Sequence, residues 1–177
     1  MPVESLNRKR LRMDKILSIL KLEYPDSKCS LKYNTPFQLL VATVLSAQCT
    51  DERVNKVVAP LFDKYPTPEA FTGLTLKEIG KQIYSTGFYN NKAKSIKGLS
   101  HALVNEYEGE VPGTMDSLVN LPGVGRKTAN VVLGNIFDVP GVVVDTHVTR
   151  ITNLLCFTKS KNAVVIEREL EKIINKS

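Results

Sequence analysis

The sequence predicts an all-α protein. Apolar residues recur at helical spacing along nearly the whole chain, as Leu11, Ile16 and Leu20 do near its start. Residues typical of helix ends divide the chain into short segments, without a Gly/Ser linker, a low-complexity block or a repeat. Residues 142–144 are three valines, but this run is too short and isolated to define a sheet. We therefore interpret it as a buried connector between helices.

Capping residues place the predicted helices. An apolar face at residues 11–20 indicates the first helix. Thr35-Pro36 begins the second helix and Thr50-Asp51 the third, because Thr and Asp cap helices and Pro fits the first turn. The proline-rich stretch at 65–68 ends the third helix before a short turn at 68–71. Further helices are predicted at residues 76–86, 91–106, 114–120, 126–137, 146–155 and 163–175.

Composition narrows the class of protein. Among 177 residues, 42% are hydrophobic and 24% are charged, which is typical of a globular protein and excludes disordered and fibrous classes. No apolar run approaches the roughly 20 residues that span a bilayer, and no apolar segment follows the basic N-terminus as in a secretory signal. There are 24 Lys and Arg against 18 Asp and Glu, a net charge of +6, which favours a polyanionic partner.

The three cysteines, Cys29, Cys49 and Cys156, are widely separated. Their number and spacing cannot build a disulfide framework or a closed four-cysteine metal site. A reducing compartment is the simplest interpretation.

Residues 121–125, between two predicted helices, contain Gly123 and Gly125 on either side of Val124. We expect both glycines to adopt positive φ and to let another molecule approach the backbone closely. Their N–H groups, together with those at the start of the next helix, would form an anion site. The alternative is a plain helical hairpin whose glycines only allow a sharp turn.

Arg126 and Lys127 begin the helix that follows. Positive charge in a first helical turn is unfavourable by roughly 0.3–1 kcal/mol per residue, because the helix dipole is positive there. A bound phosphate would reverse this effect. The placement therefore favours a nucleic-acid interface.

Residues 121–129 (LPGVGRKTA) and 144–148 (VDTHV) resemble the helix-hairpin-helix base-excision DNA glycosylases. Within that family they are most similar to the endonuclease III group, which are glycosylases and AP lyases for oxidised pyrimidines. Residues 45–51 and 87–93 match further motifs in the expected order, so the resemblance covers most of the chain. It implies a helix-hairpin-helix DNA glycosylase fold.

The resemblance assigns Lys127 as the nucleophile and Asp145 as the catalytic carboxylate. Cleavage of an N-glycosidic bond builds positive charge on the sugar, which a carboxylate stabilises. A lysine amine can then hold C1′ as a Schiff base and permit β-elimination. An ammonium is not a nucleophile, so we expect desolvation on substrate binding to help Lys127 lose its proton. The alternatives are a solvated surface lysine and an aspartate that only caps the helix predicted at 146.

Three further residues receive DNA-binding roles by resemblance. Gln48 would enter the space left by an extruded base, Phe88 would wedge against the opposite strand, and His147 would contact DNA beside Asp145. Family members often carry an aliphatic residue at the position of Phe88. The alternatives are a glutamine at a helix end, core packing for the phenylalanine and a histidine on a helix surface.

Lys92, Lys94 and Lys97 form a basic stripe at near-helical spacing. We predict that Lys92 contacts phosphate as part of this stripe. The alternative is a solvated helix face.

The family usually continues into a C-terminal loop whose four cysteines bind a [4Fe–4S] cluster. This chain has no such ligands, so we expect no cofactor, a C-terminally truncated fold and reduced stability. The expected organisation is an N-terminal helix at 1–24 that packs with the C-terminal part, a helical domain at 25–140 containing the helix-hairpin-helix at 115–137, and a return segment at 141–177. The apolar face of the N-terminal helix would then be exposed.

The predicted function is base-excision DNA repair, by a DNA glycosylase for oxidised pyrimidines that is also an AP lyase. One alternative is a monofunctional adenine-type glycosylase, against which Lys127 argues. Another is a non-catalytic or impaired helix-hairpin-helix DNA-binding fragment. The expected partner is double-stranded DNA with a damaged base or abasic site, bound by a monomer that contacts no membrane. The expected location is intracellular: the cytoplasm or nucleoid in bacteria, the nucleus or an organelle in eukaryotes.

Overall fold

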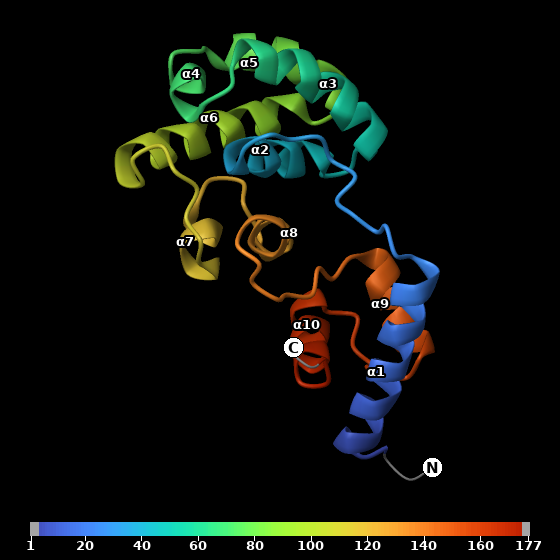
Figure 1. Ribbon diagram of the computed structural model, residues 1–177. Helices are drawn as coiled ribbons and strands as arrows, with labels where there is room; N and C mark the ends of the chain where they lie inside the picture. Colours follow the sequence, from blue (N-terminus) through green and yellow to red (C-terminus); the bar gives the residue numbers. More distant parts are fainter. Residues whose placement is uncertain (1–3, 175–177) are drawn as a thin grey trace. The chain divides into compact units, whose positions relative to one another are not determined.

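The computed structural model describes residues 4–174, and within them every regular element is helical (Figure 1). The predicted all-α class is confirmed. The chain forms two compact units. Unit 1 consists of Met1–Lys28 and Pro140–Ser177, and unit 2 consists of Cys29–Val139.

Unit 2 is built around α2, which is buried along nearly its whole length. Thr35 caps this helix by accepting a hydrogen bond from the Gln38 N–H at 3.2 Å, and Pro36 occupies the first turn. Helix α2 contacts α3, α6 and α8, so the core of the unit surrounds it (Figure 1). The bounds are α2 (Pro36–Ser46), α3 (Asp51–Lys64), α6 (Tyr89–Glu106) and α8 (Arg126–Ile136).

Three short elements, α4, α5 and η1, pack beside the long helix α6 or lead into it, and a fourth, α7, packs against α8. The predicted turn at 68–71 is the short helix α4, and the predicted helix at 76–86 ends in a 3-10 turn. Helix α6 begins two residues earlier than predicted, because Phe88 adopts a left-handed conformation and starts it. The bounds are α4 (Pro68–Thr72), α5 (Leu76–Ile83), η1 (Tyr84–Thr86) and α7 (Met115–Asn120).

Unit 1 has a small core that includes Met13, Val144, Phe157 and Ile166. Residues 142–144 form no strand, and buried Val144 confirms a connector. Helix α10 ends earlier than predicted, because the chain turns to bury Ile173; residue 175 lies outside the described residues. The bounds are α1 (Leu6–Glu23), α9 (Thr146–Leu154) and α10 (Ala163–Glu171).

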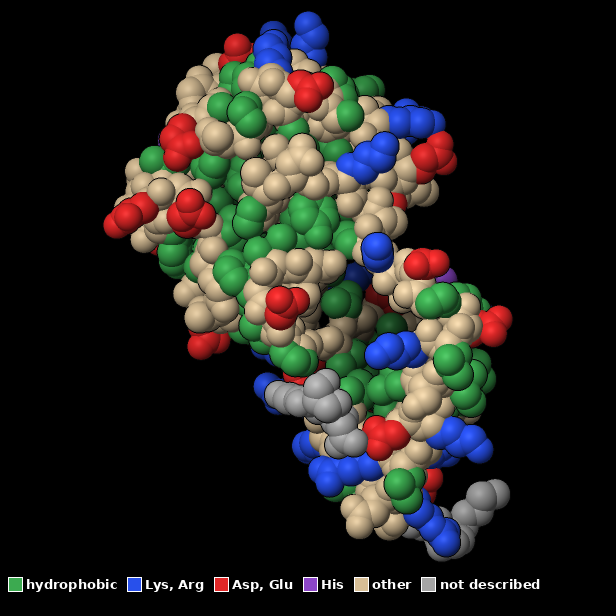
Figure 2. Space-filling model, in the orientation of Figure 1, with side chains coloured by type: hydrophobic (Ala, Val, Ile, Leu, Met, Phe, Trp, Pro, Cys, Tyr) green, Lys and Arg blue, Asp and Glu red, His purple; other side chains and the backbone are tan. Residues whose placement is uncertain are grey.

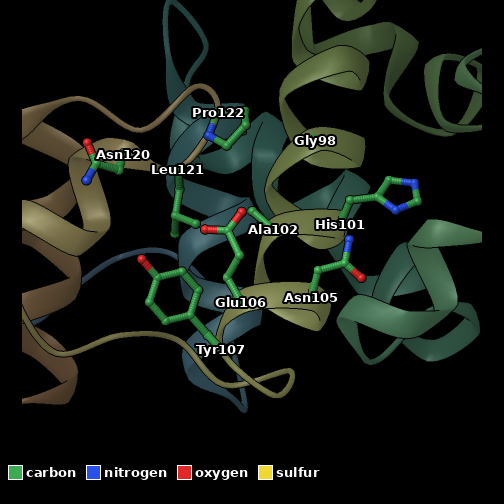
Figure 3. Close-up of a pocket in the computed structure, with 9 residues that line it drawn as sticks. All are labelled: Gly98, His101, Ala102, Asn105, Glu106, Tyr107, Asn120, Leu121 and Pro122. Carbon is green, nitrogen blue, oxygen red and sulfur yellow. The ribbon is translucent and has the colours of Figure 1, made fainter.

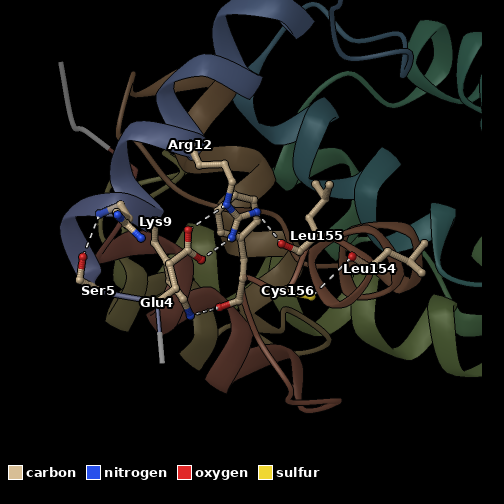
Figure 4. Close-up of polar contacts among 9 residues, drawn as sticks. Glu4, Ser5, Lys9, Arg12, Leu154, Leu155 and Cys156 are labelled. Carbon is tan, nitrogen blue, oxygen red and sulfur yellow. Dashed lines mark hydrogen bonds and ion pairs between the residues drawn. The ribbon is translucent and has the colours of Figure 1, made fainter. Parts of the chain in front are cut away.

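Polar contacts fix α1 to the loop after α9 (Figure 4). Arg12 pairs with Glu4 at 2.7 Å, donates to the Leu155 carbonyl at 2.5 Å and lies 4.0 Å above the Phe157 ring. Lys9 donates to the Phe157 carbonyl at 3.0 Å. The hydrogen bond from Arg12 lowers the pKa of the Glu4 carboxyl below its ordinary value. These contacts hold α1 even though it exposes apolar side chains, namely Leu11, Leu17, Ile19 and Leu20, as expected.

Candidate active site and nucleic-acid interface

The hairpin between α7 and α8 turns at Gly123, whose φ is +78°. The Val124 N–H donates to the Leu121 carbonyl at 3.1 Å and closes the turn. A Cβ on Gly123 would lie 2.4 Å from both Cβ and Oγ of Ser95 on α6. This glycine is therefore required by the turn and by close packing within the protein.

Gly125 is different. Its φ of −97° is in the extended region, so the expectation of positive φ is wrong for this residue. A Cβ here would meet no atom within 4 Å, and Gly125, the N-cap of α8, has no side chain to cap this helix. Nothing in unit 2 therefore requires a glycine at this position. Its lack of a side chain leaves the first N–H groups of α8 accessible to an external anion.

Lys127 lies in the first turn of α8 and is exposed, and no acidic residue shares this turn. The surface-lysine alternative thus describes the side chain in the free protein. Neighbouring Arg126 is half-buried. The two cations face an unfavourable helix dipole, as the sequence predicted.

Asp145 caps α9. Its Oδ1 accepts a hydrogen bond from the Val148 N–H at 2.9 Å, and the preceding residue, Val144, is buried. The capping alternative is therefore correct, and it fixes the orientation of the half-buried carboxylate. His147 is exposed in the first turn of the same helix. This position matches the helix-surface alternative and leaves the imidazole accessible.

Gln48 and Phe88 share an uncommon backbone conformation. Their φ values are +52° and +48°, in the left-handed region that disfavours side chains with a Cβ. Gln48 is exposed just after the end of α2, and Phe88 is 65% exposed. The core-packing alternative is therefore wrong for Phe88. Strained, exposed residues of this kind concentrate at functional sites.

Lys92 corrects the predicted basic stripe. It is only 5% exposed, and its Nζ donates to the carbonyls of Leu45 and Thr86, each at 2.8 Å. Lys97 donates to the Leu74 carbonyl at 2.7 Å, and only Lys94 is fully exposed. Lys92 thus does not lie on a surface that DNA could contact. Its partners are backbone carbonyls of its own unit.

Sequence reasoning missed both the role of Lys92 and the contact of Ser95 with the hairpin. For Lys92 a sequence pattern existed, because its spacing to Ile96, Leu99 and Leu103 places it on the buried face of α6. For Ser95 no local pattern existed, because its contact with Gly123 joins residues far apart in the sequence.

The net charge is concentrated in unit 1. This unit has 13 Lys and Arg against 8 Asp and Glu, whereas unit 2 has 11 against 10. Lys and Arg side chains and exposed apolar side chains lie around α1, α9 and α10 (Figure 2). The unit that carries Asp145 and His147 therefore supplies most of the attraction for a polyanion.

A pocket of about 320 Å³ lies between α6 and the start of the hairpin (Figure 3). Leu121, Pro122, Glu106 and Tyr107 are among its lining residues. None of the predicted site residues lines it. We therefore interpret it as space beside the hairpin and assign it no part in the reaction.

The residues present do not fit a [4Fe–4S] cluster. Cys29 and Cys49 pack against the core of unit 2, whereas Cys156 is exposed in unit 1. Residues 4–174 contain no cluster of three or more His, Cys, Asp or Glu side chains that could hold a metal. In the same range, no helix has both the length and the apolar character needed to cross a bilayer.

The all-α fold, the hairpin and the exposed first-turn lysine define a helix-hairpin-helix DNA-repair protein. Residues 41–176 match the family described as HhH-GPD superfamily base excision DNA repair protein, and the chain belongs to this family. It is 54% identical to endonuclease III of Synechocystis over 94% of the chain and 76% of that protein. It is 48% identical to endonuclease III of Bacillus subtilis over 85% of the chain and 68% of that protein.

Two solved structures extend the similarity to three dimensions. One is a non-covalent endonuclease III–DNA complex, with a TM-score of 0.90 and 45% identity over 94% of this chain and 78% of that chain. The other is a trapped endonuclease III–DNA covalent intermediate, with a TM-score of 0.89 and 46% identity over 94% of this chain and 79% of that chain. Together with the close relatives, they confirm the predicted function, a base-excision repair enzyme with DNA glycosylase and AP lyase activities.

Proposed function

We propose that Lys127 is the nucleophile of this enzyme and that its substrate is an oxidised pyrimidine or an abasic site in double-stranded DNA. The observation that carries the proposal is the position of Lys127. It is an exposed cation in the first turn of α8, two residues after Gly125, which has no side chain to cover the N-terminus of this helix. A similar protein has been trapped as a covalent intermediate with DNA, which supports covalent chemistry here.

DNA phosphates bind at the hairpin. In this proposal the phosphate accepts hydrogen bonds from the N–H groups of Gly123, Gly125 and the first turn of α8, and the positive end of the helix dipole adds to the attraction. Arg126 and the backbone around Val124 complete this contact. Because it recognises phosphate, it positions the duplex without reading its sequence.

The chemistry follows from an amine placed at a deoxyribose. Desolvation under the bound DNA favours loss of the proton from Lys127, and the amine attacks C1′. The C1′–N bond breaks, and the base leaves with the electron pair and gains a proton. Ring opening gives an iminium. Loss of a proton from C2′ then expels the 3′ phosphate, and water releases the sugar from the lysine.

Asp145 stabilises the positive charge that develops on the sugar as the base departs. Its role as N-cap suits this task, because one carboxylate oxygen is held by the Val148 N–H at 2.9 Å. A carboxylate fixed in this way needs no reorganisation during the reaction. His147, two residues further on, contacts the DNA backbone nearby.

Gln48 and Phe88 assist extrusion of the damaged nucleotide. Removing a base from the stack costs a few kcal/mol and leaves a hole in the duplex. The exposed side chain of Gln48 fills this hole, and the exposed ring of Phe88 wedges beside it. Both residues have left-handed backbone conformations beside a helix end: Gln48 follows α2, and Phe88 precedes α6.

We propose that the enzyme acts as a monomer when it carries out these steps. All the groups involved are side chains and backbone amides of this chain. Its partner is DNA rather than a membrane.

Borohydride trapping on an oligonucleotide with one abasic site tests the proposal. Reduction of the iminium should give a stable protein–DNA adduct with the wild-type chain and none with Lys127→Gln, while DNA binding persists. Lys81→Gln, which removes an exposed lysine of α5, is the charge-matched control and should still form the adduct. An adduct of undiminished yield in Lys127→Gln would refute the assignment.

A further inference from the structure

Lys92 joins the two segments that carry Gln48 and Phe88. It lies in the first turn of α6, and its buried Nζ donates to the carbonyls of Leu45 and Thr86 at 2.8 Å each. Leu45 belongs to the last turn of α2, three residues before Gln48. Thr86 ends η1, two residues before Phe88. One ammonium thus ties together the two backbones from which these side chains project.

The chemistry of both carbonyls suits a cation. The last carbonyls of a helix have no partner within the helix and carry the negative end of its dipole. Leu45 is such a residue, so an ammonium beside it is favourable. A neutral side chain of similar length, such as methionine, would leave two buried carbonyls without donors.

The backbone of Lys92 contributes a third contact. Its N–H donates to the Phe88 carbonyl at 3.1 Å, which fixes the left-handed residue at the start of α6. On the other segment, the Cys49 N–H donates to the Ser46 carbonyl at 3.0 Å and closes the turn that contains Gln48. The two strained turns are thus each closed locally, and the Lys92 side chain connects them.

Burial has a cost that the contact must offset. Desolvation lowers the pKa of Lys92, and interaction with Cys49, which follows Gln48, partly opposes this. A buried lysine is uncommon unless its ammonium is bound. Apolar side chains would fill the same space without this penalty, so the cation indicates a requirement beyond packing.

We infer that Lys92 is a positioning residue for base extrusion, which holds the turns of Gln48 and Phe88 at a fixed separation so that both side chains enter the duplex together. This inference rests on the proposed roles of those two residues. Lys92 itself contacts no DNA. It acts by positioning the two backbone segments that carry Gln48 and Phe88. Position matters because a displacement of about 1 Å of groups that act on the substrate can lower the rate about 100-fold.

The test compares two substrates that differ in their need for extrusion. One is a duplex in which thymine glycol must leave the stack, and the other is a single-stranded oligonucleotide with an abasic site. Single-turnover rates are measured at a temperature below the unfolding transition of each variant. Borohydride trapping on the single-stranded oligonucleotide gives the fraction of active enzyme, to which the rates are normalised. Lys92→Met should lower the duplex rate by roughly tenfold or more relative to the single-strand rate.

Lys97→Met is the matched control. Lys97 also lies on α6 and donates to a backbone carbonyl, that of Leu74, but this carbonyl belongs to a loop with no proposed DNA contact. Lys97→Met should therefore leave the ratio of the duplex rate to the single-strand rate unchanged. If Lys92→Met does not fold, Lys92→Gln, which keeps a shorter donor, replaces it with the same expected direction.

Base extrusion can be measured separately from the reaction in Lys127→Gln, which lacks the proposed nucleophile. The fluorescence of 2-aminopurine placed beside the lesion reports the extrusion. Adding Lys92→Met should reduce the fluorescence increase on binding. The inference would be overturned if Lys92→Met left the ratio of the duplex rate to the single-strand rate unchanged, including by an equal loss of both rates, while Gln48→Ala and Phe88→Ala each lowered that ratio. If neither of these two variants lowers it, the proposed roles of Gln48 and Phe88 fail, and the inference fails with them.

Discussion

Gly123 and Ser95 lie so close that a Cβ on the glycine would sit 2.4 Å from the serine Cβ. The hairpin can therefore pack this closely against α6 only because residue 123 has no side chain. The same helix begins after Phe88 and carries Lys92 in its first turn. One helix thus supports both the proposed phosphate contact and the proposed extrusion residues of unit 2.

Replacing Gly123 should destabilise the protein. In Gly123→Ala the new Cβ meets Ser95 at a distance that requires a backbone shift, and a φ of +78° is strained for alanine. The left-handed conformation and overpacking each cost about 1–2 kcal/mol or more. We expect urea unfolding to show a loss of about 2 kcal/mol or more; an unchanged midpoint would contradict the packing described here.

Replacing Gly125 should separate stability from binding. Gly125→Ser places its side chain in open space at an extended φ, and serine caps helices at least as well as glycine. Stability should stay within about 0.5 kcal/mol of wild type or rise. Affinity for DNA with an abasic-site analogue should fall about tenfold, equivalent to 1.4 kcal/mol, because the side chain covers the anion site. Unchanged affinity in a fluorescence-anisotropy titration would remove the phosphate contact from the account.

Two substitutions of Asp145 should distinguish its cap from its charge. Asp145→Asn keeps a capping side chain and should keep stability, whereas Asp145→Ala should lose about 1 kcal/mol. Both should slow base excision by about 100-fold or more, since the carboxylate is gone, with smaller effects on lyase activity at a preformed abasic site.

The control for Asp145 is Asn162, which caps α10 in the same unit by accepting from the Val164 and Val165 N–H groups. Asn162→Ala should lose similar stability and no excision activity. Full excision activity in Asp145→Asn would show that the carboxylate has no electrostatic role.

Several helix starts were predictable because a side-chain oxygen caps them. Thr35, Thr50 and Asp145 each accept a hydrogen bond from the first turn of their helix, so sequence and structure agree there. The start of α6 was not predictable in this way, because Phe88 has no capping oxygen and begins the helix in a left-handed conformation. The end of α10 was missed because Ile173 continues the helical spacing but is buried by a turn.

The candidate site was predictable in its residue types and less so in its environments. The resemblance identified the hairpin from residues 121–129, and the structure forms it. Two predictions were wrong, that Gly125 has a positive φ and that Lys92 is exposed, because both properties depend on tertiary contacts. Lys92 required a comparison with the apolar spacing of its own helix. Regular spacing among lysines alone does not distinguish a buried face from an exposed one.

Acid should weaken the capping box of α5. Thr75 donates from its hydroxyl and its N–H to Glu78 Oε2, at 2.7 Å each, and these bonds lower the pKa of the Glu78 carboxyl. The stabilisation is therefore present above the pKa of Glu78 in the unfolded chain and is lost as pH falls through its folded value. Urea midpoints of wild type and Glu78→Gln should differ at pH 7 and converge toward pH 3. A constant difference over this range would contradict the linkage.

The most direct measurement of the central claim is to locate the trapped sugar on the protein. After borohydride reduction on abasic DNA, nuclease and protease digestion should leave one peptide with a reduced deoxyribose remnant. Tandem mass spectrometry should place this remnant on Lys127. Its location on another lysine or on the N-terminal amine, with Lys127 unmodified, would contradict the account.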